Sequence, residues 1–376
     1  MQPLAARPVF LWFAGAALAA LLIQLFFFFR YFSAIAFHKA VKEDLKINHP
    51  VSVVVCVRNN LDNIKRLLES LLVQKHSRYE IIVVDDRSKD EVYEYLLELK
   101  EHNPLIYHIR IDHTPERLNE KKYALTMGIK GAKYKHIVFT DDDCLPVSEN
   151  WLNEMQARFT TGKTIVLGYS PYSRYPGLLN SLIRFETFYA GMQYIGCALR
   201  GSAYMGVGRN LAYTKQLFLD MKGFYKHVSI RGGDDDLFIN RAATTTNTAV
   251  CISAESFVFS EPKHTFEEWF TQKKRHYSVG KYYRLRDKFR LGLLSLSYAG
   301  FWLCLPVLGF SEQLWYWAVA ALITRQLSMS ILYLFAAKKL GEKFNMFSLM
   351  GLDFLYVFCF IYFSLSGLLA RRISWD

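Results

Sequence analysis

The chain has 376 residues, of which 52% are hydrophobic and 16% aromatic, and it carries a formal net charge of +12. The apolar share exceeds the roughly 45–50% that is usual for soluble domains. The six cysteines lie outside any CxxC or Cys/His spacing, which suits a reducing compartment and argues against a disulfide scaffold or a structural zinc site.

The first apolar segment, residues 9–29, lies near the N-terminus and carries no charge. Its length is about that of a helix that spans a bilayer, whereas the apolar region of a signal peptide has only about 7–15 residues. We therefore predict an uncleaved membrane anchor.

From about residue 44 to residue 262, strand and helix patterns alternate, which is typical of an α/β sheet with helices on its faces. Short β-branched runs predict strands at 51–57, 80–86, 105–111 and 136–140. Apolar residues at helical spacing predict helices at 61–74, 90–100 and 121–132.

Polar side chains lie at the carboxyl ends of three of these strands: Arg58-Asn59-Asn60 and Asp141-Asp142-Asp143 follow theirs, and Asp85-Asp86 end theirs. Functional groups of such sheets gather at the carboxyl ends of the strands, so the three polar ends predict one crevice. Neither GxGxxG nor GxxxxGK[ST] follows a strand, which argues against a dehydrogenase or a P-loop nucleotidase. Three adjacent carboxylates repel one another, so the last group predicts either a solvated turn or a bound cation.

Three further apolar segments, 291–310, 314–337 and 346–370, predict C-terminal transmembrane helices. Arg325 and Asp353 lie within the last two, so they must face a helix interface or a polar cavity. Residues 263–290 contain nine Lys/Arg against three acids beside a predicted span, which marks the cytoplasmic side and suits anionic lipid headgroups.

These charges predict an integral protein of the inner or cell membrane whose middle domain is cytoplasmic. Because the basic residues cluster beside spans and no basic aromatic groove is evident, a nucleic-acid partner is not expected. Arg371 and Arg372 would lie outside on a count of four spans, against the positive-inside rule, so the C-terminal topology stays open.

With these motifs in place, the chain resembles membrane-bound family 2 glycosyltransferases of the GT-A fold over residues 51–283. The resemblance implies a Rossmann-like mixed α/β sheet that binds a nucleotide sugar, with one N-terminal and about three C-terminal transmembrane helices and interfacial amphipathic helices. The implied organisation is an anchor and juxtamembrane segment at 1–43, the GT-A domain at 44–262, a basic interfacial helix at 263–290 and the transmembrane helices at 291–376.

Three motifs resemble the part of the family that holds the donor. VRNN matches the end of the first strand, although Asn60 replaces the usual Glu, and this implies donor contacts from Arg58 and Asn59. VDDRSKD is similar to VDDxSxD, whose acidic pair reads the base and ribose; here that pair is Asp85 and Asp86. In NEKKYAL, Lys121 rather than Lys122 is in register with the lysine that holds the diphosphate.

TDDDCLP resembles the DxD motif of the family, with Asp141 and Asp143 as the pair and Pro146 following. The resemblance implies that these two carboxylates bind a divalent metal ion, Mg²⁺ or Mn²⁺, which bridges to the diphosphate of the donor. Carboxylate oxygens are the hard ligands that both ions prefer.

GGDDDLFINR resembles the stretch that supplies the catalytic base. Matching both Gly233 and Arg241 places the base at Asp235, which we favour, whereas other registrations place it at Asp234 or Asp236. A capped helix start would account for two of these three carboxylates without a catalytic role.

Two further motifs concern the acceptor. MGVGRNLAYTK resembles the acceptor segment, with Gly208 and Asn210 in the usual places. QKKRHY resembles QxxRW: Gln272 and Arg275 share a helical face, and the guanidinium can meet a donor phosphate. His276 stands where processive synthases have a Trp at the acceptor sugar, which argues against processive synthesis.

The resemblance implies an inverting, metal-dependent glycosyltransferase of glycolipid or cell-envelope polysaccharide biosynthesis. It would move one sugar from a nucleotide-sugar donor, a UDP-sugar, to a membrane-held lipid or lipid-linked acceptor. The alternatives are a processive polysaccharide synthase and, in another class, a non-catalytic membrane scaffold or receptor. The apolar stripe of Phe266, Trp269 and Phe270, and the segment 175–196, predict helices at the membrane interface, with core-facing helices as the alternative.

Overall fold

The computed structural model describes residues 8–39, 48–116 and 118–369. These residues divide into an α/β unit, residues 39–269, and a helical unit of residues 8–38 and 270–369. The predicted boundary between residues 43 and 44, the end of the last predicted span at residue 370, and Arg371 and Arg372 lie outside the described residues.

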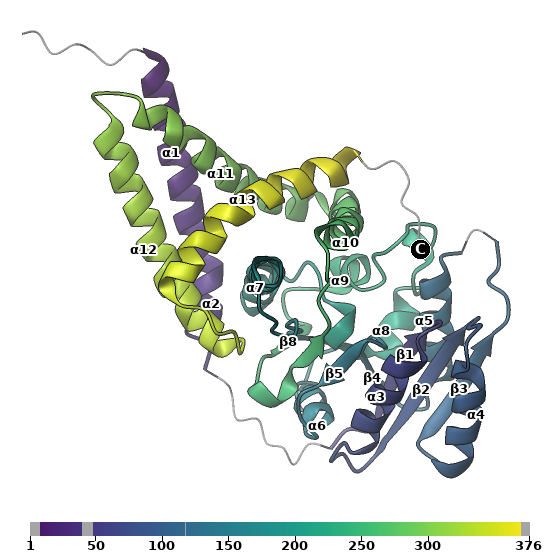
Figure 1. Ribbon diagram of the computed structural model, residues 1–376. Helices are drawn as coiled ribbons and strands as arrows, with labels where there is room; N and C mark the ends of the chain where they lie inside the picture. Colours follow the sequence, from purple (N-terminus) through teal and green to yellow (C-terminus); the bar gives the residue numbers. More distant parts are fainter. Residues whose placement is uncertain (1–7, 40–47, 117, 370–376) are drawn as a thin grey trace, which may run out of the picture. The chain divides into compact units, whose positions relative to one another are not determined.

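Within the described residues of the α/β unit, seven strands form one mixed sheet in the order β3-β2-β1-β4-β7-β6-β8 (Figure 1). The predicted α/β sheet is confirmed. Its first half is parallel and consists of β1 (Val51–Val57), β2 (Tyr79–Asp86), β3 (Ile106–Ile111) and β4 (His136–Phe139). Because Val57 pairs with Asp85, the polar ends of β1 and β2 emerge at the same edge.

The second half of the sheet reverses direction. β7 (Leu211–Thr214) runs antiparallel to β4, β6 (Ile165–Gly168) runs antiparallel to β7, and β8 (Thr248–Cys251) is parallel to β6. A separate pair, β5 (Cys144–Pro146) with β9 (Val258–Ser260), directly follows the DxD motif. This pair holds the chain on the C-terminal side of Asp143.

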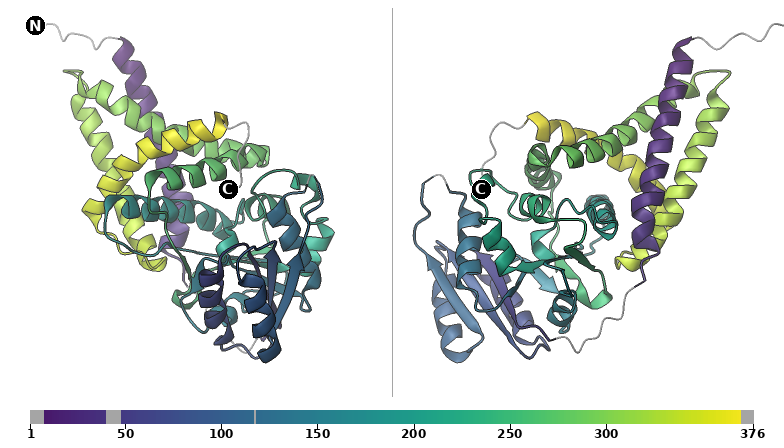
Figure 2. Two further views of the ribbon diagram at one scale, coloured as in Figure 1. Left: turned by 45° about the vertical axis from the view of Figure 1, so that its right-hand side comes forward. Right: turned by 180° about the vertical axis from the view of Figure 1, so that it is seen from behind.

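Helices cover both faces of the sheet because successive strand residues point to opposite sides (Figure 2). Val53 and Val55 pack in one core with the apolar stripe of α3 (Leu61–Leu72). Val54 points the other way, toward α5 (Glu120–Gly131), where a Cβ on Gly128 would lie 2.6 Å from the valine Cγ1. The remaining helices of the unit are α4 (Val92–His102), α6 (Trp151–Gln156), α7 (Leu178–Leu199), α8 (Lys215–Asp220) and α9 (Asp236–Ala242).

Helix α7 contains most of the segment 175–196, and it packs in the core of the α/β unit. Most of its side chains are buried. The Tyr194 hydroxyl donates to the Gly168 carbonyl at 2.8 Å, and Gly191 lies against the ring of Tyr169. These contacts favour the core-facing alternative for this helix.

Among the described residues of the helical unit, four helices are long and apolar enough to cross a membrane, as predicted. The first is continuous over residues 8–36 and comprises α1 (Pro8–Phe27), a π-helical turn and α2 (Ser33–Ala36); the others are α11 (Leu285–Gly309), α12 (Trp315–Lys339) and α13 (Met346–Leu369). Small residues of α1, including Ala17 and Ala20, pack with Phe301 of α11 and Ala318 of α12.

A buried ion pair joins the helices of this unit. Arg325 of α12 and Asp353 of α13 are both fully buried, and the guanidinium donates to the carboxylate at 2.5 Å and 3.2 Å. Gln24 of α1 accepts from Arg325 Nε at 2.7 Å and donates to the Ser297 carbonyl of α11 at 3.0 Å. The two charges therefore face a helix interface, as their position within apolar segments required.

We expect Arg325→Met to destabilise the helical unit by about 3–5 kcal/mol, because the buried Asp353 carboxylate would lose its counter-ion. The double variant Arg325→Met/Asp353→Leu should recover most of this loss, since the isolated charge is gone. Thermal unfolding of detergent-purified protein measures both, with Lys338→Met, at an exposed position of the same helix, as the control. Equal melting temperatures for the single and double variants would contradict this account.

Candidate active site

The polar ends of β1, β2 and β4 meet at one edge of the sheet. The Asn59 amide N–H donates to Ser88 Oγ at 3.1 Å, and Asn59 Oδ1 accepts from the Lys89 N–H at 2.7 Å. Asn59 has φ +51°, a left-handed conformation that Asn tolerates better than most residues. Asn60 Nδ2 donates to Asp142 Oδ2 at 2.9 Å. The three groups that the sequence places after separate strands therefore form one cluster.

The acidic pair after β2 has one oxygen that no described residue satisfies. Asp85 is fully buried and accepts from the Ser88 N–H through Oδ1 at 2.9 Å, while its buried Oδ2 has no hydrogen-bond partner. Asp86 accepts from Arg87 Nε at 2.8 Å. Buried polar atoms are normally paired, so Asp85 Oδ2 is an acceptor that a ligand donor can satisfy.

Glu120, which our sequence analysis did not select, bridges two arginines at this edge. Its two carboxylate oxygens lie 2.7 Å from Arg58 Nη1 and 2.9 Å from Arg87 Nη2. These side chains are 26–40% exposed, so the network is accessible to a ligand. Glu120 is the first residue of α5, a position at which the helix dipole already favours an acid. The sequence alone therefore did not indicate that Glu120 also pairs with two arginines.

Lys121 connects the two acidic motifs of the chain. Its Nζ donates to Asp141 Oδ1 at 2.9 Å and lies 3.6 Å from Asp234 Oδ2. Burial alone would lower the pKa of Lys121, but the two carboxylates outweigh it and hold the pKa well above its usual value. A permanently charged ammonium thus sits between the DxD motif and the second acidic run.

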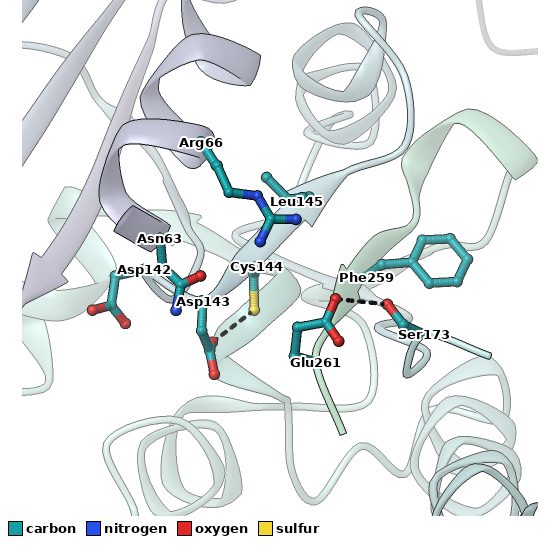
Figure 3. Close-up of a pocket in the computed structure, with 9 residues that line it drawn as sticks. All are labelled: Asn63, Arg66, Asp142, Asp143, Cys144, Leu145, Ser173, Phe259 and Glu261. Atoms are coloured by element: carbon teal, nitrogen blue, oxygen red, sulfur yellow. Dashed lines mark hydrogen bonds between the residues drawn. The ribbon is translucent and has the colours of Figure 1, made fainter. Parts of the chain in front are cut away.

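The three carboxylates of the DxD stretch occupy different environments. Asp141 pairs with Lys121. Asp142 is mostly enclosed, and burial raises its pKa to about 7 although the hydrogen bond from Asn60 opposes the rise. Asp143 accepts from the Cys144 thiol at 3.3 Å and lines a small cavity of about 20 Å³, room for about one water molecule. Figure 3 shows Asp142 and Asp143 among the residues that line this cavity.

Asp141 and Asp143 fit a divalent cation by the chemistry of their donor atoms, since both offer hard carboxylate oxygens. Among the described residues, no three His, Cys, Asp or Glu side chains are grouped to hold a metal ion. Mg²⁺ sites of this kind use one or two carboxylates and take the remaining ligands from water and substrate phosphates. Two protein carboxylates therefore suffice.

Asp235 is held in place by two backbone amides. The Gly208 N–H donates to Oδ2 at 2.7 Å, and the Asp236 N–H donates to Oδ1 at 2.7 Å. Burial, followed by the charge of Asp234, raises the pKa of Asp235 to about 6. Asp236 is buried and accepts from the Leu237 N–H at 2.7 Å, as expected of a residue in the first turn of α9. Asp235 thus combines a fixed position with raised basicity.

Asn210 supports the acceptor segment from inside the core. It is fully buried, accepts from Trp151 Nε1 at 3.1 Å and donates to the carbonyls of Tyr169 and Ser256 at 2.8 Å and 2.7 Å. Because its side chain makes these three hydrogen bonds, Asn210 fixes the backbone of the acceptor segment, and its role toward the acceptor stays a prediction. Gly208, two residues earlier, faces Asp235 directly.

Arg209, between these two residues, was also missed. Its guanidinium lies 4.4 Å from the centre of the Tyr172 ring and donates to the Ser170 carbonyl at 3.2 Å. The carboxylates of Asp143 and Asp141 are among the charges that favour its protonated state. Arg209 lies within the MGVGRNLAYTK motif. A positive charge in a motif expected near an acidic site was the feature from which the sequence could have indicated its role.

The predicted residues Gln272, Arg275 and His276 lie on α10 (Phe266–Val279). From Phe270 onward this helix belongs to the helical unit, where Phe270 stacks on Tyr362 with ring centres 4.4 Å apart. The three residues therefore belong to the helical unit, and their roles stay predictions.

Comparison with known proteins bears directly on this site. Residues 52–219 match the sequence model of the family described as Glycosyl transferase family 2. The chain is 29% identical over 136 residues to an uncharacterized glycosyltransferase of Rickettsia felis, covering 36% of this chain and 21% of that protein. It is 25% identical over 185 residues to a poly-beta-1,6-N-acetyl-D-glucosamine synthase of Staphylococcus aureus, covering 44% of each. The chain thus spans less than half the length of these curated relatives.

A solved structure shares the fold. The mannosyltransferase PcManGT from Pyrobaculum calidifontis, in complex with GDP-Man and Mn²⁺, superposes with a TM-score of 0.59 at 18% identity, covering 94% of this chain and 98% of that one. At this identity the likeness establishes the fold alone.

The mixed sheet with its acidic carboxyl edge is thus a GT-A fold, joined to helices long enough to span a membrane. The match of residues 52–219 to the model of Glycosyl transferase family 2 agrees with the resemblance noted from the motifs.

Proposed function

We propose that this protein is an inverting glycosyltransferase that moves one sugar from a nucleotide-sugar donor to a membrane-held acceptor. The observation that carries this proposal is the fixed Asp235 carboxylate, with its pKa raised to about 6, in the acidic run that Lys121 links to Asp141. A displacement at an anomeric carbon needs a base for the acceptor hydroxyl and a nearby cationic group for the leaving diphosphate.

In the proposed reaction, Asp235 accepts the proton of an acceptor hydroxyl while that oxygen attacks the anomeric carbon. The bond between this carbon and the phosphate oxygen breaks, and the nucleoside diphosphate leaves with the electron pair. A single displacement inverts the anomeric centre. General-base assistance of this kind is typically worth about 10²–10⁴-fold in rate.

Other side chains would position the donor. Asp85 Oδ2, buried without a partner among the described residues, suits a donor N–H of the base, and Lys121 suits the diphosphate. Asp141 and Asp143 would hold Mg²⁺ or Mn²⁺, which would neutralise charge on the leaving diphosphate as a Lewis acid. We expect a UDP-sugar, and GDP-sugars belong in the same assay because the similar mannosyltransferase was solved with GDP-Man.

The acceptor would be a lipid or a lipid-linked sugar, because the chain joins its glycosyltransferase domain to four apolar helices of spanning length. Basic residues between 263 and 290 favour a cytoplasmic catalytic domain. Arg275 of α10 would then add a guanidinium for donor phosphate.

A processive polysaccharide synthase is the second candidate, and one observation favours it: the matched Staphylococcus aureus relative is named as a polymer synthase. His276 in place of Trp, and a frame of four described spanning helices, favour single addition. A non-catalytic scaffold accounts poorly for the preserved Asp141, Asp143 and Asp235.

We expect EDTA to abolish transfer and Asp143→Ala to lower it by about 10²-fold or more, since charge on the departing diphosphate would lose its counter-ion. The folded state should persist, because among the described residues the hydrogen bond of Asp143 is a weak one from the Cys144 thiol. Transfer of labelled sugar in detergent measures this, and excess Mn²⁺ should restore the EDTA-treated enzyme. Full activity in excess EDTA would rule out the metal role.

We expect kcat/KM to rise with pH through about 6, because Asp235 must be ionised to act as the base. Asp235→Asn should lose transfer by about 10²–10⁴-fold yet bind the nucleoside diphosphate normally. Asp234→Asn should keep measurable transfer and move the acidic limb to lower pH, since the charge of Asp234 contributes to the raised pKa. An inactive Asp234→Asn beside a normal Asp235→Asn would assign the base to Asp234.

We expect one sugar per acceptor when labelled donor is supplied in large excess over lipid acceptor. Imidazole offers a smaller stacking face than indole and gains charge near its unperturbed pKa of about 6.5, so His276 would hold a growing glycan poorly. Mass spectrometry of the lipid products measures chain length, and an acceptor already carrying one such sugar serves as the control. A ladder of longer products from pure enzyme would establish the processive alternative.

A further inference from the structure

Lys122 is a fully buried lysine immediately beside the diphosphate-site lysine. Its Nζ donates to the backbone carbonyls of His227 and Ile230 at 2.6 Å and 2.8 Å. Burial lowers its pKa to about 8 even though Asp234, Asp236 and Asp235 favour the charged form. Enclosing an ammonium is costly, and a methionine could fill the same space. The feature that distinguishes Lys122 from an apolar residue is its hold on these two carbonyls.

The held segment leads directly into the proposed catalytic acids. Ile230 is followed by Gly232 and Gly233, with φ +76° and +77°, and then by Asp234. Two left-handed glycines in succession form a tight turn that glycine adopts at little steric cost. Without a fixed point before this turn, the acids after it would have more positions available.

A second contact ties the same segment to the first turn of α5. The Asn119 N–H donates to the Val228 carbonyl at 3.1 Å, and Asn119 Oδ1 caps the helix by accepting from the Lys122 N–H at 3.2 Å. The helix start that presents Lys121 to Asp141 and Asp234 thus also holds the segment that leads to Asp234 and Asp235. The first turn of α5 therefore contacts both the proposed diphosphate site and the segment before the proposed base.

We propose that Lys122 is a positioning residue that fixes the segment 227–233 and thereby sets Asp235 against the acceptor. The inference rests on the proposed function. Successive helical residues point about 100° apart. Lys121 therefore faces the proposed diphosphate site, whereas Lys122 faces the loop. A displacement of about 1 Å at a reacting group can cost about 10²-fold in rate, so the hold on the loop matters for turnover more than for donor affinity.

The test compares Lys122→Met with Lys130→Met, an exposed lysine at the far end of the same helix. For Lys122→Met we expect kcat to fall by about 10- to 100-fold, with the affinity for nucleoside diphosphate little changed. Lys122→Gln, whose amide can still donate to one carbonyl, should recover part of kcat. Rates are taken per nucleotide-binding-competent molecule, so loss of folded protein does not imitate the effect.

Hydrogen exchange reports whether Lys122 holds the loop, and the fall in kcat at unchanged nucleotide affinity reports what that hold does for turnover, which a purely structural role would not change. In Lys122→Met the amides of residues 228–235 should exchange faster while those of residues 124–130 in α5 stay protected. A wild-type kcat for Lys122→Met, or unchanged exchange in the loop, would overturn the inference. Absence of any transfer by the wild-type protein would instead overturn the proposed function, and the exchange experiment would still decide whether Lys122 holds the loop. If Lys122→Met does not fold, Lys122→Gln carries both measurements.

Discussion

The ion pairs of Lys121 with Asp141 and Asp234 are the interaction on which the organisation of the site depends. The sheet directs the end of β4 and the second acidic run to one place, and like charges gathered in a partly buried site raise one another's pKa. The Lys121 ammonium between Asp141 and Asp234 reduces this repulsion in the absence of a ligand. The same arrangement places the carboxylates of Asp141 and Asp143, whose oxygens are of the kind that a divalent cation prefers, near an ammonium of the kind that phosphate prefers.

The helical unit also has to accommodate charged side chains away from water, and it does so with a fully buried ion pair. Arg325 and Asp353 are closed off from solvent and satisfy each other, with Gln24 and Tyr298 completing the hydrogen bonds. A pair so fully satisfied has little capacity left for a ligand, and its value is in specifying which helices pack together. Lys121, with a side chain 24% exposed, keeps its ion pairs accessible and so can exchange them. The ion pairs of the candidate site thus differ from the Arg325–Asp353 pair in solvent exposure more than in the number of charges.

The sequence predicted the parallel half of the sheet closely, and β1 occupies the residues expected for it, because Val51–Val57 is apolar and largely β-branched except at Ser52 and Cys56. The short strands β6, β7 and β8, with four residues each, lack such a run, and their pairing is set by tertiary contacts. The edge position of the site followed from strand direction. The burial of Asn210 did not, because its partners Trp151 and Ser256 are distant in sequence. Nor could spacing reveal that Lys122 turns away from its neighbour toward a loop more than a hundred residues later.

Three consecutive aspartates, 234 to 236, show how neighbouring identical residues acquire different chemistry. Asp234 faces Lys121, Asp235 bonds the Gly208 amide, and Asp236 bonds an amide in the first turn of α9. The pKa of Asp235 is raised by burial and by Asp234, and it is lowered by Lys121 among others. An anionic group that pairs with Lys121 therefore weakens the influence that lowers this pKa and leaves Asp234 less compensated. Both effects make Asp235 a stronger base. A diphosphate paired with Lys121 would thus raise the basicity of the neighbouring carboxylate through charge, while a cation held by Asp141 and Asp143 would act in the opposite direction.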